Sequence, residues 1–499
     1  MQPLGGDALC LSFACHQPQL RFWVKNGYLR AGPSKKYLSP VLARPGVVVL
    51  RSALIQSTVA MGVKRISKCL SLLHLPCRIP APLMDLPRIQ SLLGIAFFPT
   101  LLWLFSKHRR AFPWRLAAWT LSLQLLAAWF LLRTAPGHVW FLACDGLADQ
   151  LSTVAMEGAK IVFGPLADGV RLEKAFGEGH GHVFAVWVGA VITVVSACVA
   201  LLNHWNVLPK VVSFMASLLR RTLGYSGSES LCATANGFLG HTESILVIKA
   251  YVEKLTSSEL LSTMTMGLAT VSLGAIAVYA KLGDGAGHLV TATFLSILGG
   301  LFCSKILLPE TELSHTRAGA SLGPSRTAGT AIEAVCAGAQ QGLMLALSVL
   351  AMLLAFTALV AIANITLGGA QSALGVAQPW KLEQILGLVH APVAWLTGVA
   401  SQDCLSVGDL LGRRTVFNEF LGYLALGDLR GSLSPRSFTL ATYALSGFAN
   451  PASIGMLVAA IASIAPGRMR EAAELGTRAL LAGLCTSYLS ASIAGFVLG

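Results

Sequence analysis

Apolar stretches of about 20 residues recur along most of this chain, and they constrain its fold more than any other feature. A helix of that length spans the hydrocarbon core of a bilayer. Only 12% of the 499 residues are charged and 54% are hydrophobic, whereas about one quarter of the residues in a soluble domain are charged. The bilayer is therefore the predicted solvent of this chain, and a soluble multidomain enzyme is excluded.

The net charge of +14 is concentrated at one end of the chain. Residues 1–90 contain 12 of the 37 Lys and Arg residues but only two of the 23 acidic residues. Because residues 91–499 are close to neutral, the net charge of the chain does not indicate a nucleic-acid partner. Residues 1–84 have neither helical nor strand periodicity. We expect them to form a basic extension that is disordered or that precedes the true start at Met84.

Hydropathy over a window of about 19 residues predicts eight membrane-spanning segments. They are 91–106, 114–132, 183–203, 261–280, 287–308, 341–364, 437–463 and 476–498. Two amphipathic segments, 139–163 and 205–223, are predicted to be interfacial helices. The predicted fold class is therefore an all-α polytopic membrane protein.

Two other segments are apolar enough for membrane depth but contain carboxylates and glycines. They are 227–250 and about 391–425. Irregular backbone survives at that depth only where protein buries it or where it lines a cavity. We interpret both segments as re-entrant hairpins.

The span after each hairpin contains a similar short motif, which indicates an internal repeat. Residues 267–272 read GLATVS, and residues 447–453 read GFANPAS. Small residues alone would also suit close packing of helices. However, Glu243 and Glu419 occupy matching places in the two hairpins, and an ionisable group at bilayer depth costs about 2.5–3.5 kcal/mol. Two such repeats are typical of a secondary transporter with its site near the midplane.

At these residues the sequence resembles the concentrative nucleoside transporter family. Residues 235–243 read ANGFLGHTE and match all but one position of the family's A-N-x-F-x-G-Q-T-E pattern. Further matches are LPETE at 308–312, NEF at 418–420, LSPRS at 433–437 and GFAN at 447–450. The resemblance covers about 90–499.

The resemblance implies an inverted-repeat elevator transporter with eight transmembrane helices, two hairpins and interfacial helices, assembled as a homotrimer. We expect residues 85–223 to form the N-terminal transmembrane helices and an interfacial helix, and residues 224–312 to form the first hairpin and repeat of the transport domain. Residues 313–379 are expected to form the scaffold helix region, and residues 380–499 the second hairpin and repeat of the transport domain.

The resemblance also implies site residues. The nucleobase would be held by His241, Thr242 and Glu243, and the ribose hydroxyls by Glu419, Asn450 and Ser453. A carboxylate suits a cis-diol because it accepts charge-assisted hydrogen bonds. Sodium would be held by the side chains of Asn236 and Thr270 and the carbonyls of Leu239 and Val271.

Two departures from the family pattern bear on the substrate. His241 stands where the family usually has Gln, and Ile245 stands where it has Pro. Asn236 is retained, whereas the proton-coupled branch lacks this asparagine, so sodium is favoured over a proton.

The predicted function is a symporter, not an enzyme, that couples inward sodium movement to nucleoside uptake across the plasma (cell inner) membrane. A proton-coupled nucleoside transporter is one alternative. An alternative from another class is a membrane-embedded hydrolase that uses the paired intramembrane glutamates. No H-E-x-x-H motif is present in the sequence to support it.

Overall fold

The computed structural model divides the chain into two compact units, Met1–Ala81 and Pro82–Gly499. It describes residues 9–12, 21–25 and 28–31 of the first unit, and residues 86–177, 181, 183–317, 319–320 and 329–499 of the second. The rest of 1–84, including most of the predicted disordered extension, lies outside the described residues.

The first unit contains a small antiparallel sheet of β1 (Leu9–Ser12), β2 (Arg21–Lys25) and β3 (Tyr28–Ala31), in the order β1-β2-β3. Leu9 pairs with Val24, and Phe22 pairs with Ala31. The expectation that residues 1–84 form a disordered extension or precede the true start stays a prediction. The sequence Asn26-Gly27 separates β2 from β3, and this pair is the strongest short-range signal for a two-residue hairpin.

The described part of the second unit is helical, which confirms the predicted fold class. Its N-terminal half contains α2 (Leu86–Leu104), α3 (Trp114–Arg133), α4 (Ala135–Phe163), α5 (Gly169–Phe176), α6 (Phe184–His204), α7 (Val207–Leu223), α8 (Gly227–Asn236), α9 (His241–Val247), α10 (Ser257–Ala269), α11 (Leu273–Leu282) and α12 (Ala286–Leu307). Its C-terminal half contains α13 (Ala331–Ala373), α14 (Leu382–Leu396), α15 (Cys404–Val416), α16 (Glu419–Asp428), α17 (Pro435–Leu445), α18 (Pro451–Ile464) and α19 (Met469–Leu498).

Among the described residues, six segments are long and apolar enough to cross a membrane. They are α3, α6, the α10–α11 pair, α12, α13 and the segment Pro466–Leu498 that contains α19. Each overlaps a predicted span. The other two predicted spans correspond to α2 and to the α17–α18 pair, which do not meet that criterion. Helices α4 and α7 match the segments predicted to be interfacial.

The second hairpin begins later than the sequence predicts. Residues 391–396 belong to α14, which ends just before Gly398, a residue with a φ of +92°. The hairpin itself consists of α15 and α16, with its tip at Phe417 and Asn418. The prediction of 391–425 was shifted because the apolar end of α14 continues the hydropathy of the hairpin.

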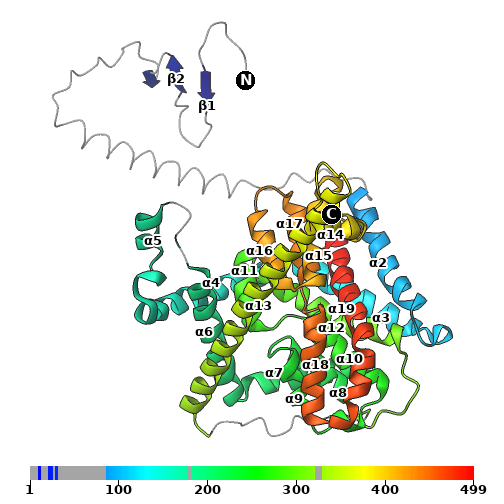
Figure 1. Ribbon diagram of the computed structural model, residues 1–499. Coiled ribbons are helices and arrows are strands. Elements are labelled where there is room, and N and C mark those ends of the chain that lie inside the picture. Colours follow the sequence, from blue (N-terminus) through cyan, green and yellow to red (C-terminus); the bar gives the residue numbers. More distant parts are fainter. Residues whose placement is uncertain are drawn as a thin grey trace. The chain divides into compact units, whose positions relative to one another are not determined.

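Helix α19 lies in the core of the second unit, packed against α2, α10, α12 and α17 (Figure 1). Helix α13 instead packs along α6. The contact uses small residues: a Cβ on Gly342 would lie 2.9 Å from the carbonyl oxygen of Ile192. Small residues allow two membrane helices to approach this closely. Helix α6 in turn packs against α4 and α11 and so connects α13 to the rest of the second unit.

Candidate substrate and cation site

Two helices of the second unit are broken, each at one of the repeated sequence motifs. The first break separates α10 from α11 at residues 270–272, and the second separates α17 from α18 at residues 446–450. Gly447 has a φ of +118°, and a Cβ on it would lie 2.8 Å from the carbonyl oxygen of Leu268. The second break therefore packs directly on the last residues of α10, next to the first break, and only glycine fits at this contact.

The tip of the first hairpin lies against the first break. The tip consists of residues 237–240, between α8 and α9, and Gly240 has a φ of +124°. A Cβ on Gly240 would lie 3.7 Å from the Cβ of Ser272. Each tip and each break precedes a helix, so α9, α11, α16 and α18 all begin here. Helix N-termini carry unpaired N–H groups and suit electron-rich ligands.

The second hairpin brings Glu419 to Asn450 of the second break. Glu419 begins α16, and its side chain is only 6% exposed. Its Oε2 accepts a hydrogen bond from Asn450 Nδ2 at 3.1 Å, and its Oε1 accepts one from the Tyr279 hydroxyl at 2.9 Å. Asn450 Oδ1 accepts from the backbone N–H of Ser453 at 2.9 Å and so caps α18. The structure thus brings together the three predicted ribose residues.

The first hairpin supplies the three predicted nucleobase residues from the start of α9. The Thr242 hydroxyl donates to Glu243 Oε2 at 2.9 Å. Glu243 Oε1 accepts from Gln341 Nε2 of α13, also at 2.9 Å. His241 packs against Phe448 with 5.1 Å between ring centroids, and its Nε2 is buried without a hydrogen-bond partner among the described residues. This nitrogen is therefore available to a ligand.

The donors predicted for sodium lie on the first hairpin and the first break. Asn236 ends α8 and is 1% exposed, yet neither its Oδ1 nor its Nδ2 has a partner among the described residues. Thr270 is equally buried, and its hydroxyl donates to the Met266 carbonyl at 2.9 Å. This bond uses the hydroxyl proton of Thr270, so the lone pairs of its oxygen remain available to a cation. Leu239 lies in the hairpin tip and Val271 in the break. The oxygen donors and the unpaired amide fit a hard cation.

Three contacts of the site escaped the sequence prediction. Tyr279 and Gln341 lie in predicted spans, where a single polar residue gives no sign of its partner. Phe448 belongs to a recognised motif, but its contact with His241 joins the two repeats and depends on the fold. An isolated polar residue within an apolar helix is the signal that could have identified Tyr279 and Gln341.

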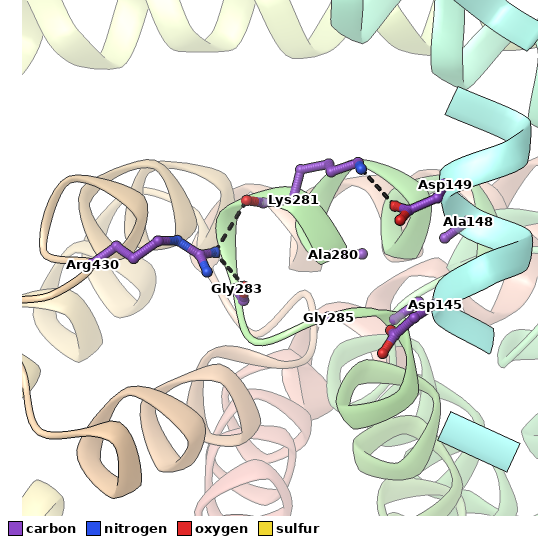
Figure 2. A pocket seen from close by; sticks show the side chains of 9 residues that line it. Asp145, Ala148, Asp149, Ala280, Lys281, Gly283, Gly285 and Arg430 are labelled. Carbon is purple, nitrogen blue, oxygen red and sulfur yellow. Dashed lines mark hydrogen bonds and ion pairs between the residues drawn. The ribbon is translucent and has the colours of Figure 1, made fainter. Parts of the chain in front are cut away.

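A polar pocket of about 330 Å³ lies elsewhere, beside α4 and the α11–α12 connection (Figure 2). Lys281 Nζ lies 2.5 Å from Asp149 Oδ1, and Arg430 donates to the carbonyl of Gly283 at 2.7 Å. None of the nine residues that line this pocket is a predicted site residue. It is distinct from the candidate site.

The sequence matches three known family regions in order. Residues 93–166 match the N-terminus of Na⁺-dependent nucleoside transporters, 185–285 match a region described as a gate for nucleoside recognition, and 288–495 match the C-terminus of Na⁺-dependent nucleoside transporters. Together these regions include every predicted site residue.

Two bacterial relatives are matched over nearly their full length, and a mammalian relative over about two thirds of its length. The chain is 36% identical over 408 residues to YutK, an uncharacterized transporter of Bacillus subtilis, covering 82% of this chain and 98% of that protein. It is 33% identical over 417 residues to the nucleoside permease NupC of Helicobacter pylori, covering 82% and 97%. It is 33% identical over 431 residues to the rat sodium/nucleoside cotransporter 1, covering 82% and 64%.

A solved structure shares the fold. CNTnw, in an inward-facing substrate-bound state, superposes with a TM-score of 0.77 at 32% identity, covering 82% of this chain and 98% of that one. These relatives are transporters and not enzymes, so the hydrolase alternative is wrong. By sequence and by fold, the chain belongs to the concentrative nucleoside transporter family, and it is a multi-pass membrane protein.

Proposed function

We propose that this protein is a symporter that couples inward movement of sodium to uptake of nucleosides across the plasma (cell inner) membrane. The description of the matching family and the name of the rat relative support sodium as the coupling ion. The name of the Helicobacter pylori relative supports a nucleoside as the substrate.

The observation that carries the proposal is the buried carboxylate of Glu419. An ionised carboxylate offers about four acceptor positions. Tyr279 and Asn450 use one on each oxygen, at 2.9 and 3.1 Å. Both oxygens therefore retain a lone pair, and two adjacent lone pairs match the two hydroxyls of a ribose cis-diol. Ser453, next to Asn450 at the start of α18, completes this polar face.

The nucleobase would bind on the first hairpin. Thr242 and Glu243 present a hydroxyl and a carboxylate, and the unpartnered Nε2 of His241 adds one donor or acceptor. The neighbouring Phe448 ring offers an apolar face to a flat base. Histidine in place of the usual glutamine changes the hydrogen-bonding pattern that a base would meet.

The coupling ion would bind at Asn236. An amide does not titrate between pH 5 and 8, so its orphaned oxygen suits a metal ion and not a proton. Sodium would be held by the side chains of Asn236 and Thr270 and by the carbonyls of Leu239 and Val271. The ion would link the hairpin tip to the broken helix, so that its binding shapes the neighbouring nucleoside site.

Transport would occur by an elevator movement of both hairpins and broken helices within a homotrimer. The exposure of α13 agrees with an assembly, because only four of its 43 residues are buried within one chain. Its remaining apolar surface is available to lipid or to other copies.

The decisive experiment is uptake of labelled uridine and adenosine into proteoliposomes. With an inward sodium gradient, we expect accumulation above the external concentration, and replacement of sodium by choline should abolish it. Uptake in choline that is driven by a proton gradient would instead establish the proton-coupled alternative.

A variant pair tests the ion ligands. Thr270→Val removes the hydroxyl oxygen and should raise the sodium concentration for half-maximal uptake. Thr486→Val is the matched control, because this buried threonine makes the same bond to the carbonyl four residues earlier, at 2.7 Å, within α19. Equal sodium curves for the two variants would remove Thr270 from the proposed site.

A further inference from the structure

Helix α7 has two apolar stripes, and only one of them is covered by protein. The buried stripe recurs every three or four residues, as one helix face does, and the helix packs against α8. The buried residues are Leu208, Val212, Ala216 and Leu219. The second stripe has the same spacing, but its residues are 39–71% exposed: Val207, Val211, Phe214 and Leu218. A helix that lies in a membrane surface places such a stripe against lipid.

The remaining face of α7 carries positive charge. Lys210 lies four residues before Phe214, and Arg221 lies three residues after Leu218, so both border the exposed apolar stripe. Both are exposed, and neither forms an ion pair among the described residues. The helix contains no acidic residue. Its unpaired cations therefore lie at the boundary between lipid and water, where lipid phosphates lie.

Helix α4, the other predicted interfacial helix, has the opposite charge balance. It contains three acidic residues, Asp145, Asp149 and Glu157. Its one lysine, Lys160, pairs with Glu157 at 2.7 Å. An interfacial position therefore does not by itself require a basic helix, and the charge of α7 indicates an anionic partner.

Helix α7 lies on the basic side of the membrane. A Cβ on Gly319, in the connection after α12, would lie 3.6 Å from Arg220 Nη1. At the end of α12 the carbonyl of Leu307 accepts a hydrogen bond from the N–H of Lys107 at 3.0 Å. That lysine begins the sequence KHRR at 107–110. The positive-inside rule predicts that this connection, and α7 with it, lies on the cytoplasmic side, where anionic lipids give the membrane a negative surface potential.

A hollow of about 450 Å³ lies at the start of α7. It is lined by Trp205, Asn206, Pro209, Lys210 and Ser213. The ammonium group of Lys210 and the hydroxyl of Ser213 are donors that suit a phosphate oxygen. Trp205 is 57% exposed, and tryptophan favours the headgroup level of a bilayer. The hollow therefore has the chemistry to hold the phosphodiester of a lipid.

We propose that α7 binds anionic phospholipids of the cytoplasmic leaflet. Lys210 holds one headgroup in the hollow, Arg221 binds a second headgroup about three turns along the helix, and the exposed apolar stripe lies against the acyl chains. Residues 224–226 join α7 to α8. Bound lipid therefore stabilises the base of the first hairpin, whatever the substrate and the coupling ion are.

Melting of the purified full-length protein in lipid–detergent micelles tests the proposal. In an uncharged detergent, phosphatidylglycerol should raise the melting temperature, whereas the same mole fraction of phosphatidylcholine should not. One basic residue near an anionic surface strengthens binding by about fivefold. The double variant Lys210→Gln, Arg221→Gln should therefore need about twentyfold more phosphatidylglycerol for half of the full effect.

A second double variant, Lys160→Gln with Lys174→Gln, is the matched control. It removes two exposed positive charges from α4 and α5, and it should keep the wild-type response to phosphatidylglycerol. The basic residues of 1–90 are present in all of these proteins, so their attraction to the lipid does not affect the comparison. Glycerol 1-phosphate, which has the phosphate without acyl chains, should not raise the melting temperature.

Three results would overturn the proposal. They are equal stabilisation by the two lipids, equal responses of the two double variants, and stabilisation by glycerol 1-phosphate as strong as that by phosphatidylglycerol, which would indicate a site for soluble anions. If the α7 double variant does not fold, the single variants Lys210→Gln and Arg221→Gln decide. Each should need about fivefold more phosphatidylglycerol, and an unchanged response in both would contradict the proposal.

Discussion

At the scale of single residues, the charge of Glu419 is the feature on which the proposed nucleoside recognition would depend most. Glu419→Gln should raise the KM for uridine about tenfold or more, because a charge-assisted hydrogen bond contributes about 1.5–3 kcal/mol and the amide loses one acceptor. Uptake kinetics of uridine and of 2′,3′-dideoxyuridine would measure this. The loss should be large for uridine and small for the analogue without the diol.

Tyr279→Phe is the matched control for that prediction. It removes the hydroxyl that donates to Glu419 Oε1 at 2.9 Å but leaves the carboxylate in place, so KM should rise less than in Glu419→Gln. An equal loss of uridine and dideoxyuridine uptake in Glu419→Gln would place the carboxylate outside the ribose site.

Site residues could be predicted from the sequence where a polar or charged side chain lies within an apolar, membrane-spanning segment. Glu419 and Asn450 stand out because a carboxylate and an amide are costly in an apolar span, and the structure joins them directly. The buried Arg414 of α15 was not identified, because two of its three hydrogen-bond partners are backbone carbonyls, those of Ala444 and Ser446. Every residue has a backbone carbonyl, so a hydrogen bond to one cannot be predicted from residue types.

At the scale of elements, a buried ion cluster ties the base of the first hairpin to its neighbours. Lys305 of α12 lies 2.7 Å from Glu229 of α8 and 3.1 Å from Glu310, and it donates to Ser258 of α10 at 2.9 Å. Lys305→Met leaves the Glu229 carboxylate buried without its partner. Loss of one member of a buried pair costs about 3–5 kcal/mol, so the melting temperature in detergent should fall strongly.

Lys281→Met provides the comparison on a nearby helix. Its ion pair with Asp149 is largely exposed, with side chains 41% and 66% accessible, against 8% and 2% for Lys305 and Glu229. An exposed pair contributes about 0–1 kcal/mol, so this variant should melt close to the wild type. Similar melting temperatures for the two variants would show that the cluster does not hold the hairpin base.

Element types were more predictable than their limits. The apolar runs predicted α3, α6, α12 and α19 because a helix in lipid satisfies its own backbone. The start of the second hairpin was placed too early, since α14 is apolar up to its end and only the short connection 397–403, which includes Gly398, separates it from α15. Hydropathy indicates which residues lie within the membrane, but it does not indicate where the backbone turns.

At the scale of the whole molecule, transport should depend on the second unit alone. The family matches begin at residue 93, and α2 begins at Leu86. A chain that starts at Met84 should therefore keep the sodium-driven uptake rate of the full chain. Proteoliposome uptake, normalised to the amount of reconstituted protein, would measure this.

Deletion of residues 1–105 is the contrasting case. It also removes α2, where a Cβ on Gly94 would lie 2.2 Å from the carbonyl oxygen of Leu396 and 2.5 Å from Ser492 Oγ. Loss of a helix packed this closely on α19 should abolish folded protein. Loss of uptake in the chain that starts at Met84 would assign residues 1–83 a role in transport.

The contact at Gly447 has a thermodynamic consequence. Because no side chain fits between Gly447 and the carbonyl of Leu268, a shift of the second break should displace the end of α10, next to the first break. An ion and a sugar bound at the two proposed positions would then be energetically linked, and such linkage is reciprocal. The factor by which sodium tightens nucleoside binding must equal the factor by which the nucleoside tightens sodium binding. Replacing Gly447 with a larger residue would reduce both affinity factors, for sodium and for the nucleoside, by the same amount.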